Sequence, residues 1–281
     1  MKINRLLWQL FSKQPAGQPQ TASRRSTNRG HALIVGVGGY RDLPPLATTV
    51  RDAANLAEFF ASPSGAGFAP ANVGLLLEDQ ATRSGISLAL EELARDTKPE
   101  DTIVFYFAGH GIRRLGGFEP GEYLCPIDTD SLNLRTTAIH AGDLSTALRA
   151  LPARQVVVFL DACYSGGMSA PPKTWESTAF GLSEQAYSRL AGGSGRVVIA
   201  SSKSNELSWE LATLKRGLFT HYLIEGLRGG AADPDGAVRI LDLYTYLSSH
   251  VPQHERQHPV IKGELDSNFV IVPGNRPRSD H

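Results

Sequence analysis

The chain has 281 residues, of which 41% are hydrophobic and 20% are charged, a composition typical of a globular protein with a sizeable buried core. Lys plus Arg and Asp plus Glu both number 28, so the formal net charge is zero. Such a balance creates no long-range field that would attract nucleic acid or a membrane surface. We therefore expect neither of these as a partner.

The N-terminus and the cysteine count bear on the compartment. The most apolar N-terminal stretch, residues 6–11, is too short for a signal-peptide core or a bilayer span. Two cysteines, Cys125 and Cys163, exclude a disulfide framework but not a single bridge. Cys163 follows an apolar strand in a turn with nearby glycine, which suits a free thiol. The expected location is a reducing cytoplasm.

Apolar runs divide the chain into a tail (1–30), one folded domain (31–274) and a second short tail (275–281). In chain order the expected elements are strand 32–37, helix 50–60, strand 73–77, helix 86–93 with Thr82 as its N-cap, strands 102–107, 155–160 and 196–200, helices 218–227 and 240–247, and strand 268–272. This alternation predicts an α/β fold in which helices cover both faces of a mostly parallel sheet. Chemistry in such sheets lies at the carboxyl ends of the strands.

Residues 166–195 interrupt this alternation. Glycine, proline and serine dominate the stretch, and it shows little periodicity. Long connections of this kind inside a compact domain are usually functional or disordered. We expect it to be a control element that begins three residues after Cys163.

Two predicted strands are each followed by a reactive polar side chain. FYFAGHG at 105–111 delivers His110, and FLDACYSG at 159–166 delivers Cys163. On neighbouring parallel strands the two side chains would share one rim, where an imidazole can take the thiol proton to create a nucleophilic thiolate. The backbone N–H groups of Gly111 and Cys163 could then hold the oxyanion.

Each residue alone also has a structural interpretation. A single histidine at a strand end is often a hydrogen-bonded structural residue, and a single cysteine is often a small buried hydrophobe. The matched contexts, 53 residues apart, favour the catalytic pair.

At these residues the chain resembles the caspase, metacaspase and bacterial caspase-like family. Caspases carry Gln-Ala-Cys with a histidine about 50 residues upstream, and here Asp161 stands in the place of that glutamine, as in metacaspases. Further similarity lies in ALIVGV (32–37), RDAANL (51–56), YLCPID (123–128) and GLFT (217–220). The resemblance implies a six-stranded, mostly parallel sheet sandwiched by helices and a cysteine endopeptidase with a Cys-His dyad.

The resemblance also implies where the substrate binds. Metacaspase-like proteins build the pocket for the residue before the scissile bond from carboxylates, which here match Asp52 and Asp161. Such a pair suits Arg, which can be held bidentately, or Lys. Metacaspases commonly have Ser at the position of Ala108, so one hydrogen bond to substrate is lost. Protein or peptide substrates are the expected partners.

Regulation is expected by analogy as well. The linker of similar proteins is often cut during activation, which points to self-cleavage at Lys173 or Arg189, and an upstream activator fits a monomeric zymogen. The chemistry requires no cofactor, and we expect no bound metal. Calcium activation is weakly supported, because Asp128, Asp130 and Asp143 are scattered whereas calcium needs six to eight oxygens.

Two other classes of protein share parts of this pattern. A catalytically silent caspase-like scaffold would keep the fold, but it need not keep both His110 and Cys163. A nucleotide-binding module would share the β-α alternation, but GVGG at 36–39 lacks the full dinucleotide fingerprint.

Overall fold

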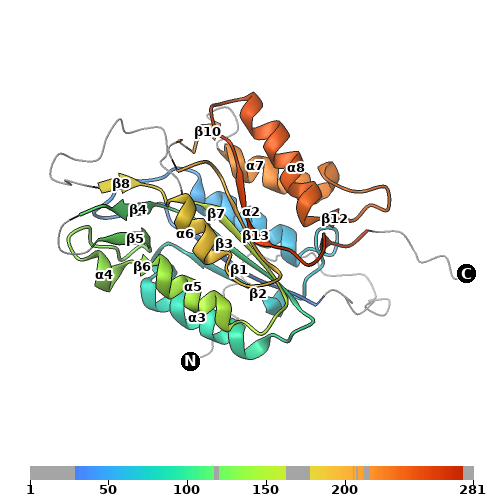
Figure 1. Ribbon diagram of the computed structural model, residues 1–281, viewed down its shortest axis with the longest axis horizontal. Helices are drawn as coiled ribbons and strands as arrows, with labels where there is room; N and C mark the ends of the chain where they lie inside the picture. Colours follow the sequence, from blue (N-terminus) through green and yellow to red (C-terminus); the bar gives the residue numbers. More distant parts are fainter. Residues whose placement is uncertain are drawn as a thin grey trace, which may run out of the picture.

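A six-stranded sheet forms the centre of the computed structural model, which describes residues 29–116, 120–162, 178–204, 206, 208–211 and 216–274 (Figure 1). The strand order is β13-β9-β7-β3-β1-β2. Five strands run parallel, and β13 pairs antiparallel with β9. The predicted mostly parallel six-stranded sheet is therefore confirmed. The strands are β1 (Gly30–Gly36), β2 (Val73–Leu77), β3 (Thr102–Ala108), β7 (Gln155–Asp161), β9 (Arg196–Ala200) and β13 (Val260–Glu264).

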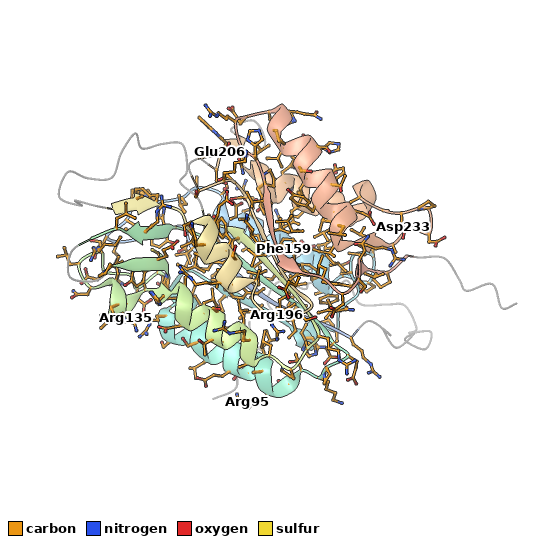
Figure 2. All side chains as sticks on the ribbon, in the orientation of Figure 1. Arg95, Arg135, Phe159, Arg196, Glu206 and Asp233 are labelled. Carbon is orange, nitrogen blue, oxygen red and sulfur yellow. The ribbon has the colours of Figure 1, made fainter. Side chains whose placement is uncertain are left out.

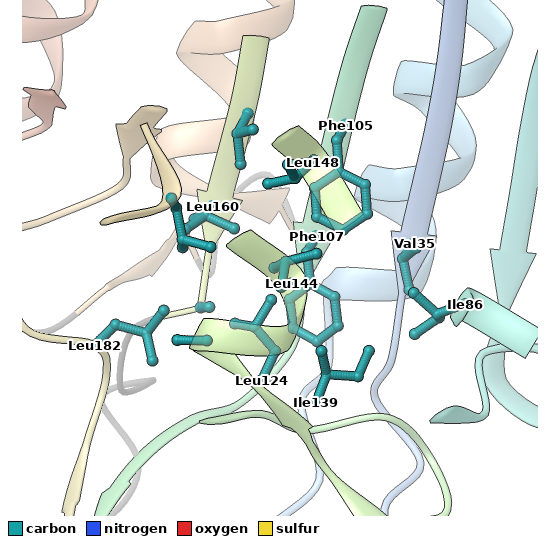
Figure 3. Close-up of a cluster of buried hydrophobic side chains, with 14 of the residues drawn as sticks. Val35, Ile86, Phe105, Phe107, Leu124, Ile139, Leu144, Leu148, Leu160 and Leu182 are labelled. Carbon is teal, nitrogen blue, oxygen red and sulfur yellow. The ribbon is translucent and has the colours of Figure 1, made fainter. Parts of the chain in front are cut away.

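Helices cover both faces of this sheet (Figure 1). Because side chains alternate along a strand, β3 sends Phe105 and Phe107 to one face and Val104 and Tyr106 to the other. The first face packs on α3, α5 and α6, and Figure 3 shows part of that cluster. The second face packs on α2, α7 and α8. The helices are α2 (Thr49–Ala61), α3 (Arg83–Asp96), α5 (Ala141–Ala150), α6 (Glu184–Leu190), α7 (Leu218–Glu225) and α8 (Ile240–His250).

Shorter strands and turns lie outside the six-stranded sheet. A four-stranded antiparallel sheet has the order β6-β5-β4-β8, and two pairs, β10-β11 and β12-β14, lie apart from it. Their bounds are β4 (Gly111–Arg114), β5 (Gly121–Leu124), β6 (Ile139–His140), β8 (Thr178–Phe180), β10 (Glu210–Leu211), β11 (Arg216–Gly217), β12 (Val238–Arg239) and β14 (Val270–Val272). The remaining turns are α4 (Leu134–Thr137), η1 (Pro70–Asn72), η2 (Glu78–Gln80), η3 (Gly226–Gly230) and η4 (Val251–Gln253).

Several charged side chains lie at the periphery of these layers. Figure 2 shows Phe159 near the middle of the molecule, with Arg95, Arg135 and Asp233 toward its outside. Within the described ranges no helix is both long and apolar enough to cross a membrane.

The structure differs from the sequence predictions at the last strand and at 166–195, and agrees with them at the start of α3. The last strand, expected at 268–272, forms as β14, but it pairs with β12, and β13 takes the sixth place in the main sheet. The stretch 166–195 is not one long loop, because its part after residue 177 contains β8 and α6. The cap of α3 is confirmed, since Thr82 Oγ1 accepts a hydrogen bond from Gly85 N at 3.0 Å.

Candidate active site

The carboxyl ends of β3 and β7 form one rim of the sheet. Ala108 pairs with Asp161 at the last position of their shared parallel register, and Gly109 N donates to Asp161 O at 3.3 Å. The chain then reaches His110 and turns into β4 at Gly111. The register thus brings the segment that carries His110 beside the end of β7.

The two glycines that flank His110 permit close approach of neighbouring atoms. A Cβ added to Gly109 would stand 2.6 Å from the hydroxyl of Tyr40, and one added to Gly111 would stand 2.6 Å from the carbonyl oxygen of Ala162. Both separations are shorter than a van der Waals contact. Side chains at these positions would push His110 away from Tyr40 and from the end of β7.

Hydrogen bonds fix His110 in place, and the residue is only 2% exposed. Its Nε2 lies 2.8 Å from the carbonyl oxygen of Pro44, and its backbone N–H donates to the Tyr40 hydroxyl at 2.9 Å. A carbonyl can only accept, so Nε2 must carry the proton. Nδ1 is buried and has no hydrogen-bond partner among the described residues. The neutral ring therefore holds its free lone pair at Nδ1.

Burial keeps this ring uncharged. Desolvation lowers the pKa of His110 below its usual 6.5, and the hydrogen bond to Pro44 partly opposes that shift. The rings of Tyr40 and Phe180 pack beside the imidazole, with centroids 4.9 and 5.5 Å away. A neutral imidazole with an open Nδ1 has the protonation state that a general base requires.

Asp52 and Asp161 converge on Gly217. Asp52, 1% exposed on α2, accepts a hydrogen bond from Gly217 N through Oδ2 at 2.8 Å. A Cβ on Gly217 would lie 3.0 Å from Oδ2 of Asp52 and 3.3 Å from Oδ2 of Asp161. The structure thus brings together two carboxylates that are 109 positions apart in the sequence.

The Asp52 carboxyl is held in an unfavourable environment for its charge. Burial is the largest cause that raises its pKa from 3.8 to about 7, and the charge of Asp161 adds to it. Hydrogen bonds from Gly217 and Thr48 and the charge of Arg216 oppose the shift. Its Oδ1 is buried without a hydrogen-bond partner among the described residues. Such a group would gain from a cation that supplied both charge and donors.

Asp161 is oriented by two hydroxyl groups. Ser208 Oγ donates to Oδ1 at 2.8 Å, and Thr220 Oγ1 donates to Oδ2 at 2.9 Å. Since the Thr220 proton goes to Asp161, the 2.8 Å contact between Thr220 and the Tyr106 hydroxyl must have Tyr106 as donor. The result is a directed chain of hydrogen bonds from the sheet core to the carboxylate.

Gln257 supports the same network from the segment after α8. Its side chain is fully buried, and Nε2 donates to Ser208 Oγ at 3.1 Å and to Ser201 O at 3.0 Å. Its Oε1 accepts a hydrogen bond from Trp209 N at 2.9 Å. Sequence reasoning missed Gln257 because the residues around it, 250–259, are mostly polar and give no sign of its burial. Tyr40 and Pro44 were missed as well.

The remaining predictions about site residues concern Cys163, Lys173, Arg189 and Ala108. Cys163 and Lys173 fall outside the described residues. Arg189 lies in α6, where its guanidinium contacts Glu122 at 3.1 Å and its carbonyl accepts a hydrogen bond from Ser145 at 2.7 Å, so cleavage there would require the helix to open. Ala108 is 1% exposed, and its side chain belongs to the cluster beneath α2 and α7.

The three acids considered for calcium are engaged separately. Asp128 accepts a hydrogen bond from Arg83 N at 2.8 Å, Asp130 accepts bonds from Leu132 and Asn133, and Asp143 pairs with Arg135 at 3.7 Å. Across the described ranges, no group of three or more His, Cys, Asp or Glu residues is arranged to hold a metal.

Comparison with known proteins agrees with this architecture. Metacaspase-1 of Ajellomyces capsulatus is 24% identical over 213 residues, which cover 70% of this chain and 58% of that protein. Metacaspase-1 of Saccharomyces cerevisiae is 26% identical over 178 residues, or 58% of this chain and 39% of that protein. The chain thus spans about half the length of such curated relatives.

A solved structure shares the fold. The crystal structure of a Geobacter sulfurreducens protein superposes with a TM-score of 0.63 and 19% identity, and the match covers 87% of this chain and 97% of that one. The family model described as the caspase domain matches residues 29–270. The chain therefore belongs to the caspase-domain family of peptidases.

Proposed function

We propose that the protein is a cysteine endopeptidase that cleaves after Arg or Lys, with Cys163 as nucleophile and His110 as general base. The observation that carries this proposal is the convergence of the buried Asp52 and the half-buried Asp161 on Gly217, at the rim where His110 emerges. Two acids beside one backbone amide form a recognition site for a cation. Cys163 follows Asp161 by two positions, as His110 follows its register partner Ala108.

The chemistry follows from the protonation state of His110. Its free Nδ1 takes the proton of the Cys163 thiol, and the thiolate sulfur attacks the scissile carbonyl. The N–H groups of Gly111 and Cys163 stabilise the oxyanion. As the tetrahedral intermediate collapses, the C–N bond breaks and His110 returns the proton to the leaving amine. Water, deprotonated by the same imidazole, then hydrolyses the thioester and releases the acid product.

The acidic pair supplies the specificity. A guanidinium bound between the carboxylates could donate to the unpartnered Oδ1 of Asp52 and offset the burial of that charge. Arg is preferred over Lys because its planar fork can bond two oxygens at once. A substrate with Asp at the same position would place a third carboxylate there, so cleavage after Asp is not expected.

A panel of matched fluorogenic peptides that end in Arg, Lys or Asp tests this proposal. We expect the purified protein to cleave the Arg peptide fastest, with and without added calcium compared in parallel. The Cys163→Ala variant serves as the blank for contaminating peptidases. Cleavage only after Asp would overturn the pocket assignment. If no peptide is cleaved with or without calcium, the result would favour a catalytically silent scaffold.

Gly217→Ala is expected to raise KM for the Arg peptide and to leave kcat much less affected. Gly217 has an ordinary φ of −64°, so alanine introduces no backbone strain, but its methyl group would crowd both carboxylates. Overpacking of this kind costs about 1–3 kcal/mol, or at least roughly fivefold in KM. Steady-state kinetics measure the split between the two constants.

Gly74→Ala is the matched control, because a Cβ there would meet Leu33 at an ordinary 3.5 Å. Equal KM values for Gly217→Ala and the control would place the substrate side chain away from Gly217.

A further inference from the structure

Both anchors of the His110 side of the site come from one irregular segment, residues 37–48, which connects β1 to α2. Pro44 supplies the carbonyl that bonds Nε2 of His110, and Tyr40 supplies the hydroxyl that accepts its backbone N–H. The same hydroxyl donates to Cys125 O at 2.7 Å. The tautomer of the base therefore depends on the placement of this segment.

Packing and hydrogen bonds together hold segment 37–48: the side chains of Val37, Tyr40, Leu43 and Leu46 are buried in the hydrophobic core. Its ends are closed by the hydrogen bond from Leu46 N to Gly38 O at 3.0 Å and by that from Thr49 Oγ1 to Val37 O at 2.8 Å. A further support on the backbone amides of Gly38 and Gly39 would keep the Pro44 carbonyl in register with the imidazole.

Glu78 provides such a support from the neighbouring edge strand. Gly36, the last residue of β1, pairs with Leu77, the last residue of β2, so Glu78 emerges at the same rim. Its carboxylate accepts hydrogen bonds from Gly39 N, at 3.0 and 3.2 Å to its two oxygens, and from Gly38 N at 3.5 Å. One side chain thus binds two consecutive backbone amides of the segment.

The backbone of Glu78 is unusual as well. With φ of 43°, it is the one non-glycine residue at positive φ in the described part of the chain. Such a conformation is strained for a residue with a Cβ and persists only where the surroundings enforce it, often at functional sites. Here it directs the carboxylate back across the end of β1 toward Gly38 and Gly39.

We propose that Glu78 is a positioning residue for the catalytic base: by holding the amides of Gly38 and Gly39 it fixes the segment whose Pro44 carbonyl keeps the proton of His110 on Nε2. This inference rests on the proposed peptidase function, in which Nδ1 must be free to accept the thiol proton. Glu78 contacts neither the imidazole nor the acidic pair, so its effect reaches the reaction only through segment 37–48.

Three substitutions separate the carboxylate from the strained backbone. Glu78→Gly removes the carboxylate and is comfortable at positive φ, so it tests the proposal even if Glu78→Ala folds poorly. Glu78→Gln keeps one acceptor oxygen for Gly39 and should restore most of the function. Glu91→Ala, an exposed acid on α3, is the matched control.

Two readouts decide the outcome. We expect Glu78→Gly to lower kcat about 10- to 100-fold, as small misplacements of catalytic groups do, with KM for the Arg peptide little changed. In parallel, imidazole 15N shifts of His110, assigned by comparison with His110→Ala, should report the Nε2–H tautomer in the wild type and in Glu78→Gln. In Glu78→Gly they should report a mixture of tautomers.

A pure Nε2–H tautomer in Glu78→Gly would overturn the proposal, and so would a loss of activity that appears in KM alone. If the wild type cleaves no peptide, the proposed function fails, but the tautomer measurement still decides whether Glu78 positions His110.

Discussion

Replacement of His110 with alanine is expected to lower kcat by about 10²- to 10⁴-fold, the usual contribution of a general base. The reason lies in its hydrogen bonds: Pro44 holds Nε2–H, Nδ1 is left as the acceptor, and burial lowers the pKa of the ring so that it is neutral at pH 7. Cys163→Ala, which lacks the nucleophile, should have no turnover. KM for the Arg peptide should change little in His110→Ala, because the acidic pair is left intact.

His250→Ala is the matched control, since His250 lies on α8 and its Nδ1 bonds the backbone of its own helix. Partial restoration of His110→Ala by added imidazole would identify proton transfer, rather than packing, as the missing function. Thermal unfolding by circular dichroism checks that both variants are folded. Turnover of folded His110→Ala above about one hundredth of the wild-type rate would contradict the dyad, because a general base contributes at least about 10²-fold.

The positions of His110 and Asp161 were accessible from the sequence because strands dictate them. Apolar runs of five to seven residues define parallel strands, and residues that follow such strands share a rim. The register of Ala108 with Asp161 then places the segment that carries His110 beside the end of β7. Asp52 and Asp161 could be paired only through the family resemblance, because nothing in the spacing of 109 residues indicates contact.

Tyr40, Pro44 and Glu78 were not predictable in the same way. Pro44 acts through a backbone carbonyl, which every residue possesses, and Glu78 acts through a conformation that the sequence does not encode locally. Gln257 has a polar side chain in a polar segment, and only the fold reveals that it is fully buried. Roles that depend on backbone atoms or on tertiary burial leave no periodic pattern in the sequence.

The strands that were missed are short or lie at edges. β13 contains Lys262, Gly263 and Glu264, and as an edge strand it lacks the continuous apolar run of a central parallel strand. The strands of the four-stranded sheet have two to four residues, too few for an alternation to be distinguished from a loop. Periodicity therefore predicted the central layer and not the small sheet that borders the site.

Asp52→Asn is expected to lower kcat/KM for the Arg peptide and, at the same time, to stabilise the folded protein. Removal of one partner of a buried charge pair costs about 2 kcal/mol or more, so kcat/KM for the Arg peptide at pH 8 should fall by roughly 30-fold or more. The Gly217 hydrogen bond can be kept, because the amide oxygen of Asn can still accept it. Glu58→Gln, an exposed change on the same helix, is the control.

The pKa of Asp52 also predicts the acid limb of the wild-type profile. Below about pH 7 the carboxyl takes up a proton and loses its attraction for a guanidinium, so kcat/KM should fall up to about tenfold per pH unit. His110 has its pKa lowered from 6.5 and would titrate at lower pH. Asp52→Asn should therefore lose the limb near pH 7, and an unchanged limb in that variant would assign it to another group.

Stability should depend on pH through the same group. Ionisation of Asp52 favours binding of the Arg side chain but disfavours folding. Because the pKa of Asp52 rises from 3.8 in the unfolded chain to about 7 in the folded one, the folded state holds an extra proton between these values. The free energy of unfolding should then fall as pH rises from about 4 to 7, by up to about 1.4 kcal/mol per unit. Urea unfolding of wild type, Asp52→Asn and Glu58→Gln across this range measures the slope. Asn cannot ionise, so the curve of Asp52→Asn should lack this contribution. Equal slopes in all three proteins would show that ionisation of the buried Asp52 does not destabilise the fold.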